Sequence, residues 1–324
     1  MNTSKPIVLA TRGSALALAQ TNAVLAQCRT AFPQLAFEAR IIKTTGDKLQ
    51  TASMAQEGTS LPKGLFTKEL EVALLNGQAD LAVHSLKDLP TELPAGLILG
   101  AVGKRADVRD VLIYRHAGAS PARGFGRDVK VKDFPAGAVI ATSSTRRKAQ
   151  LLTLNPGLKL PDIRGNVATR MQKVANNSEL DATILALAGL TRLQFHIDAA
   201  GNISGEAVPS GLLATILNLE DMLPCVGQGA VGIEVREGDE RVAAICKALN
   251  HAPTQTAVTA ERAFLAGMGG GCQSPVAAYA EVEGTQLKLK ALSFARGPVR
   301  QAQGAGSSDR AVELGQQLAA ELKK

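Results

Sequence analysis

Basic side chains recur in short segments that combine arginine or lysine with glycine, serine or threonine directly after apolar runs. Four such segments are residues 10–14, 84–88, 143–147 and 164–170. An arginine fork binds a carboxylate or phosphate through parallel hydrogen bonds, and the start of a helix adds free backbone N–H groups. Each segment therefore predicts an anion-binding site, and several such sites indicate a ligand with several negative groups.

Two further residues could carry chemistry. Asp88 is the one carboxylate inside the basic segment 84–90. There it could stabilise a developing positive charge or relay a proton, or it could form a structural salt bridge to Lys87 or an arginine. Cys272 follows three glycines in segment 269–275, which permit close approach of the backbone and favour an exposed thiol. A lone cysteine is more often inert, but this glycine-rich context favours a functional one.

Composition excludes other kinds of site. The net charge of +7 favours an acidic partner, but the chain has no Trp, two Tyr and eight Phe, too few aromatic platforms for a single-strand nucleic-acid binder. The four histidines and four cysteines show no metal-ligand spacing, so we expect no metal. Segment 226–232 has neither the ending of a P-loop nor the spacing of a dinucleotide loop, which favours a hinge or a close-packing turn.

The chain also suggests a cellular location. Its first residues lack the apolar region of a secretory signal, and no uncharged apolar stretch is long enough to span a bilayer. The cysteines form no disulfide framework, so each is expected to be a free thiol. We therefore expect a cytoplasmic protein that does not associate with membranes.

Apolar runs alternate with helical patterns in two similar sets. The first set predicts strands at 7–10, 35–42 and 81–83 and helices at 15–29 and 67–76; the second predicts strands at 139–142, 158–163 and 181–185 and helices at 145–154 and 166–174. The strands are almost wholly apolar, which is typical of a mainly parallel sheet covered on both faces. Asp80 and Asp181 occur at corresponding positions at the third strand of each set, which supports a weak internal repeat.

This pattern predicts an α/β fold with two similar doubly wound domains, like those of periplasmic binding proteins, and a small C-terminal α+β domain. The predicted divisions are 1–103 with 229–247, 104–228, and 248–324, because a strand at 231–235 suits the first sheet. In such sheets ligands bind beyond the carboxyl ends of the strands, where the basic segments lie. Segments 47–63 and 199–211 are predicted insertions, the first a lid.

Seven segments together resemble the porphobilinogen deaminase family, also called hydroxymethylbilane synthases. They occur in family order at residues 10–14, 63–71, 82–90, 142–147, 164–170, 226–234 and 270–275. The resemblance implies a transferase of tetrapyrrole and haem biosynthesis that condenses four porphobilinogen molecules head to tail into hydroxymethylbilane, with release of ammonia. It also implies a monomer that hands its product to a cyclising synthase. Cys225 departs from the family, which commonly has a small apolar residue there.

The resemblance also implies roles for individual residues. A dipyrromethane cofactor would be attached to Cys272 through a thioether, and Asp88 would be catalytic. The residues implied to hold this cofactor are Lys87, Asp88, Ser143, Arg146, Arg147, Arg164 and Gly165. Those implied to bind substrate are Arg12, Ser14, Phe66, Arg164, Thr169, Arg170, Ala188, Gly189, Arg192 and Gln228.

Two other functions share parts of this pattern. A non-catalytic binding protein with two hinged domains has the same doubled layout, and fold alone does not fix function. Such receptors are commonly exported, whereas this sequence shows no export signal. A cytosolic nucleic-acid binder is disfavoured by the shortage of aromatic residues.

Overall fold

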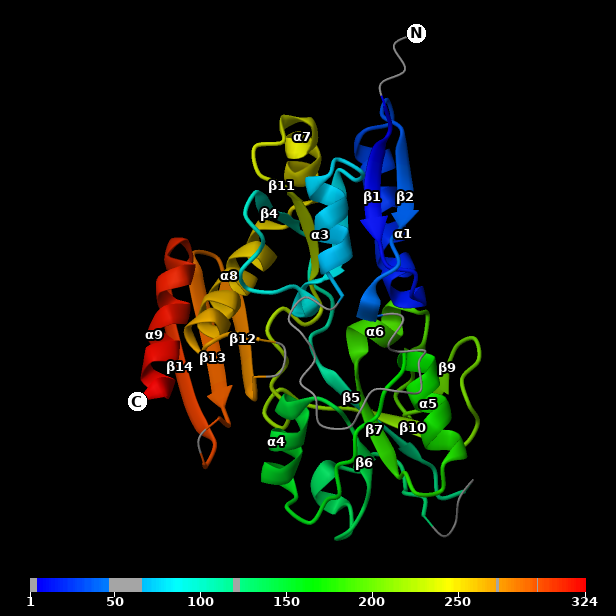
Figure 1. Ribbon diagram of the computed structural model, residues 1–324. Helices are drawn as coiled ribbons and strands as arrows, with labels where there is room; N and C mark the ends of the chain where they lie inside the picture. Colours follow the sequence, from blue (N-terminus) through cyan, green and yellow to red (C-terminus); the bar gives the residue numbers. More distant parts are fainter. Residues whose placement is uncertain (1–4, 47–65, 119–122, 272–273, 296) are drawn as a thin grey trace.

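The computed structural model describes residues 5–46, 66–118, 123–271, 274–295 and 297–324 (Figure 1). The strands are β1 (Ile7–Thr11), β2 (Phe37–Ile41), β3 (Leu81–Ser85), β4 (Leu97–Val102), β5 (Asp110–Arg115), β6 (Ile140–Ala141), β7 (Ala182–Ala186), β8 (His196–Ile197), β9 (Ile203–Ser204), β10 (Leu212–Ile216), β11 (Val231–Arg236), β12 (Val276–Glu283), β13 (Gln286–Ser293) and β14 (Arg300–Ser307). The α-helices are α1 (Ala15–Ala31), α3 (Lys68–Leu75), α4 (Thr145–Leu154), α5 (Val167–Asn176), α6 (Leu187–Arg192), α7 (Glu240–Leu249), α8 (Ala252–Gly267) and α9 (Ala311–Lys323). Short 3₁₀ helices are η1 (Leu86–Asp88), η2 (Val131–Asp133) and η3 (Ser308–Arg310). These elements confirm the predicted α/β class with a C-terminal α+β unit.

The two larger sheets have related but mixed topologies. The first has the order β2-β1-β3-β11-β4, and the second β10-β5-β7-β6. β1 runs parallel to β2 and β3, and β6 runs parallel to β7, whereas β11 and β5 are antiparallel to both of their neighbours. Each sheet thus contains one strand that opposes the rest. Because β11 lies in the first sheet, two separate stretches of the chain build that sheet.

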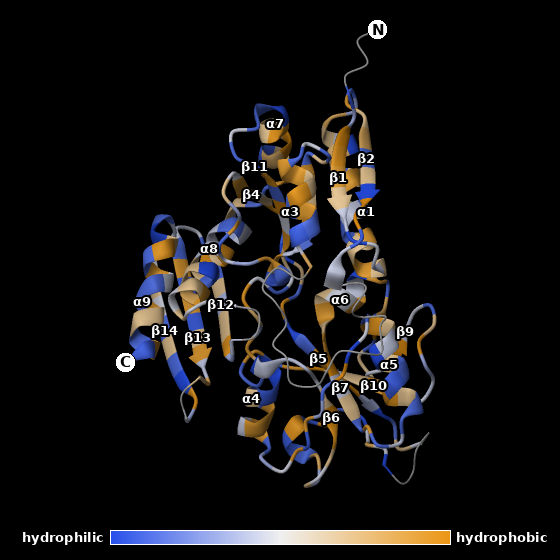
Figure 2. Cartoon of the chain, in the orientation of Figure 1, coloured by the Kyte–Doolittle hydropathy of each residue, from blue (hydrophilic) through white to orange (hydrophobic). Residues whose placement is uncertain are grey.

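Helices cover both faces of the first sheet (Figure 2). Leu9 and Val83 pack with side chains of α1 and α7, whereas Val8 and Ala82 pack against Leu70 and other residues of α3. Neighbouring residues of one strand point to opposite faces, so a sheet buried on both sides needs apolar residues at successive positions. This burial explains the continuous apolar runs in the sequence.

The same local contact occurs before the third strand of each set. The Asp80 Oδ2 atom accepts a hydrogen bond from the Val8 N–H at 2.8 Å, and the Asp181 Oδ2 atom accepts one from the Val139 N–H at 2.7 Å. Each carboxylate thus links the beginnings of two adjacent strands. The weak repeat seen in the sequence therefore has a structural counterpart.

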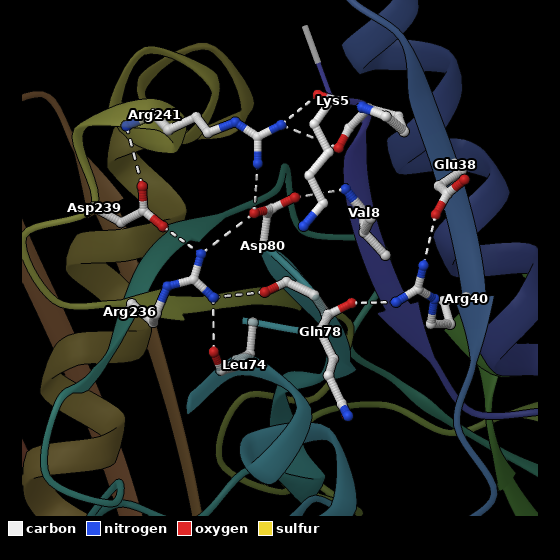
Figure 3. A network of polar contacts seen from close by, with 12 residues as sticks. Lys5, Val8, Glu38, Arg40, Leu74, Gln78, Asp80, Arg236, Asp239 and Arg241 are labelled. Atoms are coloured by element: carbon white, nitrogen blue, oxygen red, sulfur yellow. Dashed lines mark hydrogen bonds and ion pairs between the residues drawn. The ribbon is translucent and has the colours of Figure 1, made fainter. Parts of the chain in front are cut away.

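Asp80 is also the centre of an ion-pair network at this end of the first sheet (Figure 3). It is 5% exposed and pairs with Arg236 at 3.3 Å and Arg241 at 2.8 Å. We expect Asp80→Ala to lower the free energy of unfolding by about 2 kcal/mol, because the Val8 N–H and two partly buried cations lose their acceptor. Urea denaturation measures the change.

Glu38 provides a matched control in the same view (Figure 3). Its ion pair with Arg40 has a 2.9 Å separation, but both side chains are 45% exposed. Exposed pairs contribute little, so Glu38→Ala should change the free energy of unfolding by no more than about 0.5 kcal/mol. Equal losses in both variants would contradict a special role for Asp80.

The C-terminal unit consists of the antiparallel sheet β12-β13-β14 with α8 and α9 packed together on it. α8 is a long helix that begins at Ala252, with His251 as its N-cap. Its Glu261, fully buried, accepts hydrogen bonds from Arg105 at 2.6 Å, the Gly227 N–H at 2.8 Å and the Ala280 N–H at 2.9 Å. Arg105 and Gly227 lie on the two connections between the larger sheets. One carboxylate therefore joins the C-terminal unit to both connections.

The predicted strand at 158–163 is wrong. Only Lys159 forms an isolated bridge, with Val139, although the segment continues beside β6 through hydrogen bonds to the Lys159 and Pro161 carbonyl groups. Pro161 has no N–H to donate, which prevents a regular ladder. The predicted insertion 199–211 contributes β9, which pairs with β8, whereas the predicted lid 47–63 lies outside the described residues.

Candidate functional site

Three of the basic segments lie at helix starts, as the sequence predicted. Ser14, Ser144 and Asn166 are the N-caps of α1, α4 and α5, and each side chain accepts a hydrogen bond from the N–H three residues further on. The predicted helix at 145–154 is confirmed residue for residue by α4. These caps satisfy one donor each, while other N–H groups of the first turn remain available to an anion.

One small cavity brings together residues from distant parts of the chain. Its volume is about 60 Å³, and its walls include Arg12, Ser14, Phe66, His84 and Asp88. The Arg12 guanidinium carbon lies 4.2 Å from the centre of the Phe66 ring, a cation–π contact that restrains the arginine. Four residues implied by the resemblance, Arg12, Ser14, Phe66 and Asp88, therefore share one cavity.

Asp88 ends the short helix η1, which directly follows β3. The buried Leu86 fixes this helix, and its N–H donates to the Ala230 carbonyl at 3.0 Å. Asp88 itself is half-buried, and within the described part of the chain no cation lies within ion-pair distance of its carboxylate. The structural alternative, a salt bridge to Lys87 or an arginine, is therefore not formed there.

Cations from both large sheets surround this carboxylate. Burial lowers the pKa of Lys87; the Asp88 carboxylate opposes this shift, and the charge of Arg147 adds to it. Burial also lowers the pKa of Arg170 to about 10, with Arg147 adding to the shift and Asp88 opposing it. The pKa of Arg192 is likewise lowered by burial. Such shifts indicate excess positive charge away from water, which an anionic ligand would stabilise.

Asp110, the first residue of β5, is the site residue that sequence reasoning missed. It is fully buried, and its two oxygen atoms lie 2.7 Å from Arg146 and 2.7 Å from Arg147. Gln228 donates a third hydrogen bond to it at 2.9 Å. Burial by itself raises the pKa of Asp110, but the two guanidinium charges outweigh it and hold this pKa well below its usual range. The only sequence signal was a carboxylate at the start of an apolar strand.

This pairing changes the interpretation of the two arginines. They were predicted to face a ligand, but their forks hold Asp110 and two main-chain carbonyl groups, those of Leu223 and Ile184. The Nε atoms of Arg146 and Arg147 are buried and have no hydrogen-bond partner among the residues the structure describes. Each arginine therefore keeps its Nε–H group for a further acceptor.

Several other implied residues contact the main chain. The Ser143 hydroxyl donates to the Ile163 carbonyl at 2.9 Å, Arg170 donates to the Gly165 carbonyl at 2.8 Å, and Arg192 donates to the Gly229 carbonyl at 2.7 Å. These contacts fix the turns around the cavity. They still leave the other guanidinium nitrogens of Arg170 and Arg192 as possible ligand donors.

The remaining implied residues are distributed around this cluster. Ala188 and Gly189 lie in α6, and a Cβ atom at Gly189 would be 3.9 Å from the Leu16 side chain, which lines the small cavity. Thr169 donates to its own N-cap Asn166, and Arg164 is exposed. Neither is drawn into the cluster by a contact within the described residues, and Cys272 lies outside those residues.

The three described cysteines are free, as expected. Burial raises the pKa of Cys28 and of Cys246 to about 11, so both thiols stay protonated and unreactive at neutral pH. Burial also raises the pKa of Cys225, whose electrostatic neighbours include Arg146, Lys87 and Asp88. Cys225 therefore lies near the cationic cluster as a protonated thiol.

The described residues contain neither a metal-binding cluster nor a membrane-spanning helix. No cluster of three His, Cys, Asp or Glu side chains there could hold a metal ion. Among the described helices, none has the length and apolar character needed to cross a bilayer.

Known proteins resemble this chain over nearly its whole length. A family model described as "Porphobilinogen deaminase, dipyromethane cofactor binding domain" matches residues 7–244, and one described as "Porphobilinogen deaminase, C-terminal domain" matches residues 255–324. A porphobilinogen deaminase of Moorella thermoacetica is 46% identical over 286 residues, which cover 88% of this chain and 82% of that protein. One from Thermus thermophilus is 42% identical over 324 residues, covering 98% of this chain and 95% of that protein.

Proposed function

Because this chain belongs to the porphobilinogen deaminase family, we infer that it is a hydroxymethylbilane synthase, a transferase that condenses four porphobilinogen molecules head to tail with release of ammonia. The observation that carries this function is the cationic cluster of Lys87, Arg147 and Arg170 around Asp88, whose carboxylate forms no ion pair with any described residue. Each pyrrole unit carries two carboxylates. A growing chain therefore needs several cationic partners together with one group that can stabilise a cation.

The residues present fit the dipyrromethane cofactor that the family uses. Two buried Nε donors of Arg146 and Arg147 lack partners within the described structure, and the pKa of Lys87 is lowered by burial. Carboxylate acceptors would satisfy those donors and stabilise the charge on the lysine. When bound, the cofactor supplies the pyrrole end to which each new unit is joined.

The proposed anchors would each hold a different part of the cofactor. Lys87, Arg146 and Arg147 would hold its carboxylates, with Ser143, Arg164 and Gly165 beside them. Cys272 would carry it through a thioether. The support for Cys272 is its glycine-rich segment and the family match, together with the high thiol pKa values of Cys28 and Cys246, which make these two poor nucleophiles.

Asp88 would act on the reacting rings. Loss of ammonia from porphobilinogen leaves a cationic, electron-poor carbon, and a pyrrole carbon attacks it. A carboxylate held by η1, with no ion pair to the described part of the chain, can accept hydrogen bonds from pyrrole N–H groups and stabilise that cation as protons move. Because η1 is anchored through Leu86, the carboxylate needs little reorganisation during the reaction.

Arg12 and Ser14 would bind the acetate and propionate groups of the incoming substrate. The cation–π contact with Phe66 restrains Arg12 beside the cavity, so less side-chain entropy is lost on binding. Thr169, Arg170, Ala188, Gly189 and Arg192 would extend this surface from the second sheet. Gln228, which contacts Asp110 and the Val108 carbonyl, would fix the connection between the sheets rather than touch substrate.

The test is the intact mass of the purified protein. We expect a mass greater than that of the chain by two pyrrole units, and we expect Cys272→Ser to abolish the addition. Cys225→Ser is the control, because Cys225 lies near the cationic cluster but is protonated. A bare chain that binds porphobilinogen without releasing ammonia would instead indicate the hinged binding protein. An adduct that survives Cys272→Ser would overturn the assignment to this cysteine.

We further propose that the protein is a cytoplasmic monomer that releases its product to a cyclising synthase, and that it comprises the domains 1–103 with 229–247, 104–228 and 248–324. The free state of the three described cysteines supports a reducing compartment. The position of β11 between β3 and β4 supports a discontinuous first domain. Sedimentation velocity measures the oligomeric state.

A further inference from the structure

Arg262 connects the C-terminal unit to the segment that follows Asp88. It lies in α8, and its two terminal nitrogens donate to three successive carbonyl groups. The distances are 3.1 Å to Leu89, 2.6 Å to Pro90 and 3.3 Å to Thr91. One planar guanidinium therefore fixes the path of the backbone within three residues of Asp88.

Apolar packing supports the same contact. Val258, one turn before Arg262 on α8, is fully buried and belongs to one core cluster with Leu86 and Leu89. Residues four apart lie on the same face of a helix. The face of α8 that carries Arg262 thus packs against Leu86 and Leu89, which lie before and after Asp88 in the sequence.

The other end of α8 leads towards Cys272. The helix ends at Gly267, five residues and about 7.5 Å beyond Arg262, and Gly271 precedes the cysteine. Gly270 has a φ of +42°, which favours glycine, and a Cβ atom there would lie only 3.1 Å from the Thr91 hydroxyl oxygen. Gly270 therefore lies against the segment that Arg262 holds.

We propose that Arg262 is a positioning residue that holds the backbone directly after Asp88 and thereby orients the Asp88 carboxylate. This inference rests on the proposed catalytic role of Asp88. It assigns Arg262 no contact with substrate; the arginine acts through the backbone of residues 89–91. A small displacement of reacting groups can cost about 100-fold in rate, so a loose connection should slow the reaction.

The experiment compares Arg262→Ala, Arg262→Lys and Arg300→Ala in the purified full-length protein. Arg300 is a matched control because it also donates to a main-chain carbonyl, that of Leu322 at 3.0 Å, but both residues lie inside the C-terminal unit. Hydrogen–deuterium exchange of peptides spanning residues 86–97 reports on the connection without using activity. Intact mass and steady-state kinetics are measured on the same samples.

In Arg262→Ala we expect exchange in residues 86–97 to be about ten-fold faster, since three hydrogen bonds are lost. We expect kcat to fall about 10- to 100-fold with little change in KM, and the pyrrole adduct to be retained. Arg262→Lys keeps a cationic donor without the fork, so it should recover part of both effects. Arg300→Ala should match the parent protein.

Parental exchange in Arg262→Ala, or faster exchange with an unchanged kcat, would overturn the proposal. Equal effects in Arg300→Ala would also overturn it, because they would indicate general loosening of the C-terminal unit. If the parent protein carries no adduct and releases no ammonia, the proposed function fails instead. The exchange comparison still shows in that case whether Arg262 holds residues 89–91.

Discussion

Asp88→Asn should reduce kcat by about 100- to 1,000-fold while the protein keeps its fold and its bound pyrroles. Asparagine preserves the volume and one acceptor oxygen but removes the negative charge beside the developing cation. Removing one preorganised electrostatic partner typically costs about 3 kcal/mol in the transition state. The loss should appear in kcat rather than KM, because the carboxylate acts on the transition state and not on substrate carboxylates. Ammonia release under saturating porphobilinogen measures it.

Asp107→Asn provides the comparison. Asp107 lies on a connection between the sheets, and it pairs with Arg109 at 2.6 Å with a 37% exposed side chain. We expect its removal to leave kcat within about two-fold of the parent value, since exposed pairs contribute little. A near-normal kcat in Asp88→Asn would return Asp88 to a structural role.

Asp110→Asn should lower the free energy of unfolding by about 3–5 kcal/mol. The substitution leaves Arg146 and Arg147, which are 4% and 6% exposed, without a countercharge in the interior. Asp162→Asn is the matched control, because Asp162 pairs with Lys148 of the same helix α4 but is 60% exposed. We expect that control to change the free energy of unfolding by no more than about 0.5 kcal/mol. Urea denaturation of the three proteins measures both values.

The pH dependence of the stability lost in Asp110→Asn tests the ion pairs of Asp110 directly. The pKa of Asp110 is lowered in the folded protein, so its stabilisation is complete above the unfolded pKa of about 3.9 and disappears only as the pH falls through the folded value. The difference between parent and Asp110→Asn should therefore stay constant from pH 8 to about pH 5. A difference that shrinks within this range would contradict a carboxylate held ionised by Arg146 and Arg147.

The sequence predicted most elements of the first sheet and their order. The run at 7–10 and the helical pattern at 15–29 became β1 and α1, each within two residues. These signals are local: apolar periodicity fixes which faces are buried, and a serine N-cap marks where a helix can begin. The basic segments followed from the same logic, because three of them lie at the start of an α-helix.

Other elements depended on their neighbours in space. β14 has no apolar run, with glutamine and glycine among its residues, yet it forms eight paired positions with β13. The orientations of β5 and β11 also had no local signal. The chain crosses between the two larger sheets twice, from β4 to β5 and from β10 to β11. Each crossing places the strand that follows it antiparallel to its neighbours.

The residues of the site likewise fall into those that the sequence indicated and those that only the tertiary structure showed. The residue types at Arg12, Lys87, Asp88 and Cys272, together with their motifs, were sufficient to indicate the family and its anionic, pyrrole-based chemistry. Only the tertiary structure showed that Asp110 holds Arg146 and Arg147, 36 and 37 residues further along the chain, and that Arg262 holds the segment after Asp88, 171 to 173 residues away. Short patterns fix which groups a segment presents. Which buried charges become partners depends on the packing of whole sheets, because a buried charge must pair with whatever the fold brings within reach.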